Sequence, residues 1–104
     1  MDGFCPMGPS ITTRDEVPDP QSLFIRCHLN GECVQDSSTR NMLHSVADII
    51  AYASHYMTLE PGDLIATGTP AGVGAFRQPP RWLRPGDRLR LEVERLGVLE
   101  HGIG

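Results

Sequence analysis

Residues 22–34 read SLFIRCHLNGECV, and this stretch decides the fold class. Apolar side chains occupy the odd positions from 23 to 29, whereas the positions between them include Arg26 and a histidine. Such alternation predicts a strand with one buried face. Asn30-Gly31 then predicts a two-residue hairpin turn, because both residue types tolerate the positive φ that this turn requires. The expected antiparallel register places Leu29 opposite Glu32, His28 opposite Cys33 and Cys27 opposite Val34.

The same register bears on the cysteines, of which the chain has three. Cys27 and Cys33 are offset by one position across the hairpin. They are therefore expected to point to opposite faces of the sheet, which disfavours a disulfide. A set of unpaired cysteines is typical of a reducing compartment, so a cytoplasmic protein is expected.

Composition limits the class of protein. A chain of 104 residues holds one domain at most, and 39% hydrophobic residues is typical of a globular protein rather than a disordered one. The formal net charge of -4, with no run of lysine and arginine, argues against a nucleic-acid or anionic-membrane partner. No apolar stretch approaches the ~20 residues that cross a bilayer. The N-terminal segment lacks the basic and apolar regions of a signal peptide.

One helix is expected after the hairpin. Apolar residues recur at three- and four-residue spacing over positions 42–57. Ser45 and Asp48 have the spacing of a capping box, so the helix is expected to begin near Val46. Pro61-Gly62 is expected to end it.

Two Pro-Gly-Asp turns are expected to lead into further strands. Leu64 to Thr67 follows the first turn and is nearly all apolar, which predicts a short strand buried on both faces. Arg88 to Glu94 follows the second and alternates apolar with charged residues, so one face of that strand should be wet; Gly97 then turns the chain toward another strand. The polar stretch 36–41, DSSTRN, is expected to be a loop. The prediction is a mainly β protein with one helix, an α+β fold, in which several strands need a partner from another segment or subunit.

Residues 66–75, ATGTPAGVGA, form a glycine-rich loop that brings little apolar core to the fold. A phosphate-binding loop would need a lysine after the glycines, and a dinucleotide fingerprint would need a helix, which Pro79-Pro80 prevents. Two interpretations stay open: a wide loop whose glycines adopt positive φ, or a site for an anionic oxygen such as a carboxylate. The hydroxyls of Thr67 and Thr69, which flank Gly68, favour the second.

Five longer motifs occur along the chain. Residues 2–9 read DGFCPMGP, residues 30–36 read NGECVQD, residues 39–50 read TRNMLHSVADII, residues 59–74 read LEPGDLIATGTPAGVG, and the fifth motif runs from Arg84 to Leu99. All five resemble motifs of the fumarylacetoacetate hydrolase family, and they cover essentially the whole chain.

The resemblance implies a fold and a domain. The fold would be the mixed β-sheet and β-roll of that family's catalytic domain, here in part, with residues 1–104 as its C-terminal portion. Family members bind Mg²⁺ or Mn²⁺ through a Glu-x-Glu pair and an aspartate and use a catalytic lysine, all upstream of the segment that matches residues 2–9. The lysine and the metal ligands are therefore expected upstream of Met1, and the metal-binding portion is expected to be absent here. No bound metal is expected for this chain alone, and its catalytic residues are not assigned.

The resemblance also implies an activity on small 2-oxo or 2,4-dioxo acids in the catabolism of aromatic compounds. The reaction would be C–C hydrolysis, decarboxylation or enol–keto isomerisation, of the acylpyruvase or 2-hydroxyhepta-2,4-diene-1,7-dioate isomerase type. By similarity, Thr69 would donate a hydrogen bond to the substrate, while Gly68 and Pro70 shape its approach. A homodimer, or association with the missing N-terminal segment, is expected. The alternative is a non-catalytic remnant that serves as an interaction or dimerisation module.

Two other patterns could suggest a metal site. Glu92-Val93-Glu94 would place two carboxylates on one face of a strand, but its arginine neighbours favour cross-strand ion pairs. His28 and Cys33 across the hairpin are too few for a structural zinc site, which takes four ligands. The histidines are expected to be polar surface or hydrogen-bonding residues.

Overall fold

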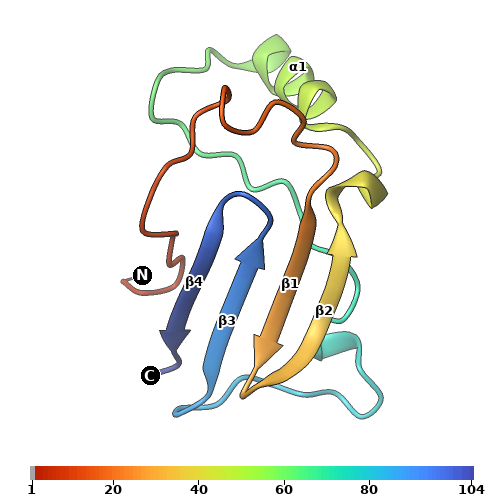
Figure 1. Ribbon diagram of the computed structural model, residues 1–104, viewed down its shortest axis with the longest axis vertical. Helices are drawn as coiled ribbons and strands as arrows, with labels where there is room; N and C mark the ends of the chain where they lie inside the picture. Colours follow the sequence, from red (N-terminus) through yellow and green to blue (C-terminus); the bar gives the residue numbers. More distant parts are fainter. Residues whose placement is uncertain (1) are drawn as a thin grey trace.

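The computed structural model describes residues 2–104. Met1 lies outside the described residues. The catalytic lysine and the metal ligands are expected upstream of Met1, and that expectation therefore also concerns positions outside the described residues. Within residues 2–104, four antiparallel strands form one sheet in the order β2-β1-β3-β4 (Figure 1). The mainly β fold with one α-helix is confirmed. The elements are β1 (Phe24–Leu29), β2 (Glu32–Ser38), η1 (Thr39–Asn41), α1 (Val46–Tyr56), η2 (Gly74–Phe76), β3 (Arg88–Val93) and β4 (Gly97–Gly102).

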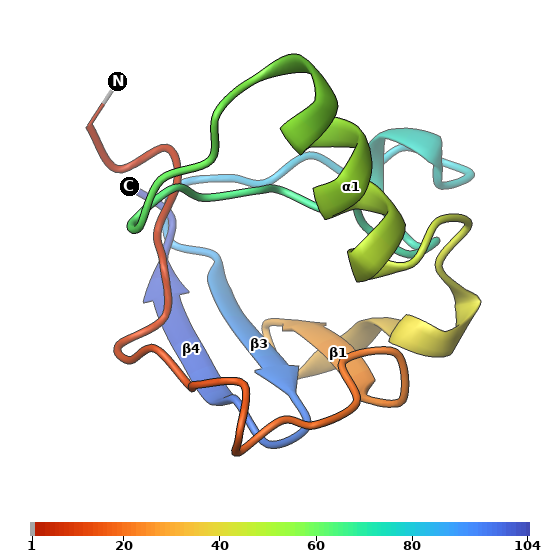
Figure 2. The ribbon, with the colours of Figure 1, turned by 90° about the horizontal axis from the view of Figure 1, so that it is seen from above.

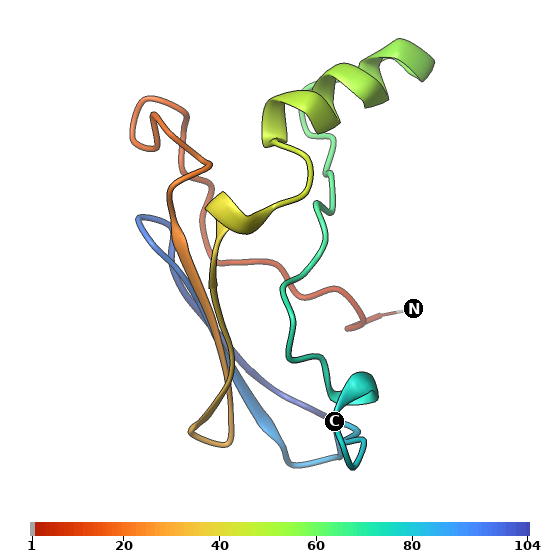
Figure 3. The ribbon, with the colours of Figure 1, turned by 90° about the vertical axis from the view of Figure 1, so that its right-hand side faces the viewer.

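The sheet forms one layer, and α1 with the segment that follows it lies on one side of that layer (Figures 2 and 3). The alternation predicted for β1 is confirmed, because Cys27 and Leu29 are buried while Arg26 is exposed. Val17 and Leu23 are the other buried apolar residues in the described part of the chain. The core is therefore small and centred on β1.

Asn30 and Gly31 form the predicted turn between β1 and β2. Their φ angles of 52° and 85° are the positive values that a type I′ hairpin turn requires. The Asn30 side chain also donates a hydrogen bond to the Asp87 carboxylate (2.8 Å) and accepts one from the backbone N–H of Arg88 (2.9 Å). The bond from Asn30 lowers the pKa of the Asp87 carboxyl. The turn thus attaches the first hairpin to the start of β3.

Joint substitution of Asn30→Val and Gly31→Val is expected to lower the free energy of unfolding by about 1–3 kcal/mol, because β-branched residues tolerate positive φ poorly. Thermal denaturation followed by circular dichroism measures the change. Gly8→Val is the matched control, since its φ is not positive and an added Cβ would meet no atom closer than 4.0 Å. Equal melting curves for the two variants would contradict the assignment of the turn.

The ladder between β1 and β2 departs from the predicted register. The first two residue pairs are as predicted, but Cys27 faces Gln35, because a β-bulge at Val34 inserts one residue into β2. The predicted pair of Cys27 with Val34 is therefore wrong. The thiol of Cys33 spans the bulge and donates to the backbone carbonyl of Gln35 at 3.4 Å. Beyond the bulge, each β2 side chain lies on the face opposite to the one predicted.

β2 also extends further than predicted. Residues 36–38 continue the strand, so the prediction of a loop over 36–41 is wrong for its first half. Arg26 forms an ion pair with Asp36 across the ladder at 3.1 Å. A strand at the exposed edge of a sheet depends more on its backbone ladder than on apolar side chains. The polar composition of residues 36–38 therefore led to the wrong prediction of a loop.

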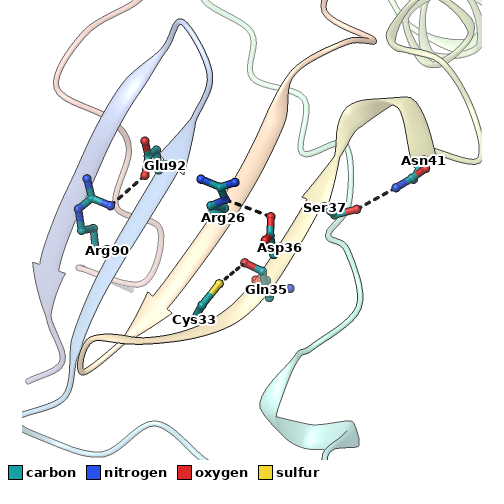
Figure 4. Close-up of polar contacts among 8 residues, drawn as sticks. All are labelled: Arg26, Cys33, Gln35, Asp36, Ser37, Asn41, Arg90 and Glu92. Atoms are coloured by element: carbon teal, nitrogen blue, oxygen red, sulfur yellow. Dashed lines mark hydrogen bonds and ion pairs between the residues drawn. The ribbon is translucent and has the colours of Figure 1, made fainter.

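The charged face of β3 carries ion pairs, one of which crosses between strands as predicted. Arg90 lies 2.9 Å from Glu92 on its own strand and 3.5 Å from Glu100 on β4. Figure 4 shows the Arg90–Glu92 and Arg26–Asp36 pairs on the same stretch of sheet. Glu92 is thus a member of a surface ion-pair network.

α1 begins where predicted. The Ser45 hydroxyl accepts a hydrogen bond from the backbone N–H of Asp48 (3.0 Å), and the Asp48 carboxylate accepts one from the N–H of Ser45 (3.2 Å). These bonds complete the capping box and lower the pKa of the Asp48 carboxyl. The helix ends at Tyr56, earlier than Pro61-Gly62 predicted, because the backbone at Met57 is already extended (φ −148°, ψ 150°).

The two Pro-Gly-Asp turns share one geometry. Gly62 and Gly86 have φ angles of 97° and 93°, and Asp63 and Asp87 each accept a hydrogen bond from the backbone N–H three residues earlier. The second turn leads into β3 as predicted. Leu64 to Thr67, however, is exposed and forms no strand, so that prediction is wrong. An apolar run becomes a strand only beside a ladder partner, and residues 2–104 offer it none.

Large apolar side chains are exposed on and after the helix. α1 has no buried residue, and Tyr52, Tyr56 and Leu64 are 70%, 68% and 73% exposed. None of the described helices is both long and apolar enough to cross a lipid bilayer.

We expect the isolated chain to self-associate at micromolar concentration, because exposed apolar surface of the kind found on and after α1 promotes association. Sedimentation velocity measures this, and a single compact monomer would contradict it.

Candidate functional site

The glycine-rich loop of residues 66–75 is attached to β2 by one side chain. Gln35 Nε2 donates a hydrogen bond to Thr69 Oγ1 at 3.0 Å and another to the carbonyl oxygen of Pro70 at 2.9 Å. The loop lies on the same side of the sheet as α1 (Figure 3). Gln35 belongs to the motif of residues 30–36, but no sequence pattern predicted its contact with the loop, because its partners lie more than thirty residues away along the chain.

Two glycines allow the loop to approach neighbouring backbone. Gly72 has φ 104°, and a Cβ at this position would collide with the carbonyl oxygen of Val34, the bulged residue of β2. A Cβ at Gly74 would collide with the backbone carbonyl of Arg81. The backbone N–H of Arg81 in turn donates a hydrogen bond to the Gly74 carbonyl at 2.9 Å. Both positions therefore require glycine.

The loop forms one wall of a cavity of about 550 Å³. Residues 67–71 line this wall, and residues 37–39 and 41–44, from the end of β2 to the start of α1, line most of the other. The polar groups of the lining are hydroxyls, one amide and one imidazole. No charged side chain of the described chain lines the cavity.

All three residues predicted to contact the substrate, Thr69, Gly68 and Pro70, lie on the loop wall of this cavity. Gly68 has φ 99°, and no atom lies within 4 Å of the position that its Cβ would occupy. Within residues 2–104, the backbone N–H groups of Gly68 and Thr69 donate to no protein acceptor. The loop wall therefore contains two backbone N–H groups without a protein acceptor and one hydroxyl, which accepts a hydrogen bond from Gln35.

The sequence did not predict the opposite wall. Ser37, Asn41 and His44 line the cavity there, and the Asn41 amide donates to the Ser37 hydroxyl at 3.2 Å (Figure 4). The Thr39 hydroxyl accepts a hydrogen bond from the backbone N–H of Leu23 at 3.0 Å, which holds this wall against the sheet. The bulge at Val34 brings Ser37 to this face, and no pattern in the sequence marks the bulge.

The side chains of residues 2–104 do not fit a hard divalent cation. Mg²⁺ and Mn²⁺ prefer carboxylate oxygens, and the cavity lining contains none. Among residues 2–104 there is no group of three or more His, Cys, Asp or Glu side chains that could hold a metal ion. We therefore assign no metal-dependent step to these residues.

A second cavity, of about 420 Å³, is lined by His28, Arg88, Arg90 and Glu100 together with the hairpin turn. His28 faces Cys33 as predicted. Its buried Nδ1 has no hydrogen-bond partner in the part of the chain that the structure describes, contrary to the prediction for the histidines. Glu100 in this cavity is paired with Arg90 at 3.5 Å.

Comparison with known proteins identifies the family of the chain. A family profile described as "Fumarylacetoacetate (FAA) hydrolase C-terminal" matches residues 1–103. The chain belongs to the fumarylacetoacetate hydrolase family. The mitochondrial oxaloacetate tautomerase Fahd2a of Rattus norvegicus is 50% identical over 99 residues, which is 95% of this chain and 32% of that protein. Its counterpart fahd2 in Xenopus laevis is 47% identical over 103 residues, or 99% of this chain and 32% of that protein. The chain thus spans about a third of the length of these family members.

Solved structures of the family share the fold. The fumarylacetoacetate hydrolase of Exiguobacterium antarcticum matches with a TM-score of 0.95 and 46% identity, covering 99% of this chain and 37% of that one. The maleylpyruvate hydrolase of Sphingobium, in complex with manganese(II) and pyruvate, matches with a TM-score of 0.87 and 42% identity, covering 97% of this chain and 36% of that one. The family and fold expected from the five motifs are confirmed.

Proposed function

We propose that this chain forms the carboxylate-binding wall of an enzyme that acts on small 2-oxo or 2,4-dioxo acids. The observation that carries the proposal is the placement of Gly68, Thr69 and Pro70 on one cavity wall, with the N–H groups of Gly68 and Thr69 left without protein acceptors in residues 2–104. Unpaired backbone N–H groups beside a hydroxyl form a favourable site for an anionic oxygen.

The composition of the cavity supports a small acid held by dipoles. No lysine or arginine of the described chain lines it, so this wall would contribute N–H and O–H groups to the recognition of the carboxylate. Thr69 would donate to the acid, Gly68 would allow the acid to approach the backbone, and Pro70 would fix the direction of the loop. Apolar residues on the opposite wall, Met42 and Leu43, would contact the carbon chain of the substrate. These residues bind and orient the acid.

The reaction itself requires groups from elsewhere. We propose that residues 1–104 are the C-terminal portion of a catalytic domain, and that the Mg²⁺ or Mn²⁺ ligands and a catalytic lysine lie in a further portion, upstream of Met1. Support comes from relatives about three times as long and from the manganese and pyruvate in the maleylpyruvate hydrolase. The choice among hydrolysis, decarboxylation and isomerisation would depend on that portion.

Assembly and compartment belong to the same proposal. The exposed side chains of α1 would be covered by the metal-binding portion or by a second copy of the chain in a homodimer. All three cysteines are free, with Cys5 and Cys33 exposed and Cys27 buried, which favours a reducing compartment such as the cytoplasm. The mitochondrion is the alternative, because the rat and Xenopus relatives carry that designation.

A chimera tests the proposal. Residues 2–103 of this chain replace the matching segment of the Sphingobium maleylpyruvate hydrolase, and calorimetry measures pyruvate affinity in the presence of Mn²⁺. We expect an affinity within about tenfold of the parent enzyme, a difference of about 1.4 kcal/mol. A folded chimera that binds Mn²⁺ but not pyruvate would refute the proposal. It would favour the non-catalytic interaction module, which the exposed helix also supports.

A further inference from the structure

We propose that Gln35 is a positioning residue that makes Thr69 a dedicated hydrogen-bond donor to the substrate. The inference rests on the proposed function and extends it to a residue outside the cavity lining. Gln35 reaches the loop through a single nitrogen, which lies 3.0 Å from Thr69 Oγ1 and 2.9 Å from the Pro70 carbonyl oxygen.

The Pro70 carbonyl fixes the orientation of the Gln35 amide. A carbonyl oxygen can only accept a hydrogen bond, so the amide group that faces it must be NH₂ rather than C=O. The two hydrogens of that NH₂ serve the two oxygens. Thr69 Oγ1 is thereby an acceptor toward Gln35, and its own proton is available to another acceptor.

This arrangement suits an anionic ligand. A hydroxyl can rotate and either donate or accept, but the Thr69 hydroxyl already accepts from Gln35 and so offers its proton toward the cavity. A carboxylate offers acceptors only, so it complements a hydroxyl held in the donor state. Gln35 itself would never touch the acid.

The β-bulge at Val34 places Gln35 on the face of the sheet that lies toward the loop. Without the inserted residue, Gln35 would pair with Arg26 and lie on the charged face of the sheet, away from the loop. With it, Gln35 pairs with Cys27, whose side chain is buried. The carbonyl of Val34 receives the close approach of Gly72. The bulge, Gln35 and Gly72 therefore together position the loop against β2.

A double-mutant cycle in the chimera tests the inference, with the pyruvate dissociation constant measured at saturating Mn²⁺. Gln35→Met keeps the length of the side chain and removes both hydrogen bonds, and we expect pyruvate affinity to fall about tenfold. We expect the double variant with Thr69→Val to bind as weakly as Thr69→Val alone, within about twofold. Independent effects that multiply would overturn the inference, as would unchanged affinity of Gln35→Met.

Gln35→Glu supplies a readout that loss of structure would not give. Its carboxylate would accept the Thr69 proton, so pyruvate affinity at pH 7 should fall below that of Gln35→Met. As the pH falls to about 4, just below the ordinary pKa of a glutamate, the introduced carboxyl becomes mostly protonated and can donate again, and affinity relative to the unsubstituted chimera should recover. A pH-independent loss would overturn the inference. If Thr69→Val itself leaves pyruvate affinity unchanged, the proposed function fails along with it.

Discussion

Gly72→Ala is expected to lower kcat/KM of the chimera by about 100-fold while the sheet remains folded. A Cβ at this position would collide with the carbonyl oxygen of Val34 and lie 3.1 Å from Gln35 Cγ. The loop must then move away from β2 and carry Thr69 with it. A displacement of about 1 Å at a substrate-positioning group is enough to cost roughly 100-fold in rate.

Gly62→Ala is the matched control for this effect. Gly62 has a φ of 97°, close to the 104° of Gly72, but nothing lies within 4 Å of its Cβ position and it is outside the cavity lining. It therefore shares the backbone strain without the collision. Equal losses of kcat/KM in both variants would assign the effect to backbone strain. A loss below about threefold for Gly72→Ala would show that close contact between the loop and β2 is not needed for activity.

Thr69→Val is expected to lower kcat/KM by about 10- to 150-fold with little change in melting temperature. The substitution keeps the shape of the side chain and removes one hydroxyl. Hydrogen bonds to charged groups contribute about 1.5–3 kcal/mol, which corresponds to that range of rates. Steady-state kinetics of the chimera and its thermal denaturation are measured side by side.

Thr58→Val serves as the control for Thr69→Val. Thr58 is exposed, follows α1 and does not line the cavity, so kcat/KM should stay within about twofold of the unsubstituted chimera. If Thr69→Val also stays within twofold but lowers the melting temperature, the loop is an architectural element and does not bind substrate.

Local signals in the sequence predicted much of the fold. The Asn30-Gly31 turn, the β1 alternation and the Ser45–Asp48 capping box depend on residues at most a few positions apart, and all three are confirmed. The substrate-binding role expected by family resemblance for Gly68 to Pro70 stays a prediction, and the structure places these residues together on one wall of a cavity.

The errors have a different physical origin. Leu64 to Thr67 has the composition of a buried strand, but burial and a ladder depend on neighbours distant in sequence, which residues 2–104 do not provide. The carbonyl oxygen of the bulged residue Val34 lies against Gly72, and no local pattern encodes that contact. The contact of Gln35 with the loop was missed for a related reason, because the face of the sheet on which Gln35 lies follows from the bulge.

The most direct test of the central claim is a crystal structure of the chimera with Mn²⁺ and pyruvate. The account predicts a pyruvate carboxylate oxygen within hydrogen-bond distance, about 2.5–3.0 Å, of Thr69 Oγ1. It also predicts that Gln35 Nε2 remains bonded to Thr69 and Pro70, as it is in the free chain. Pyruvate bound in the cavity without a contact to residues 68–70 would contradict the account.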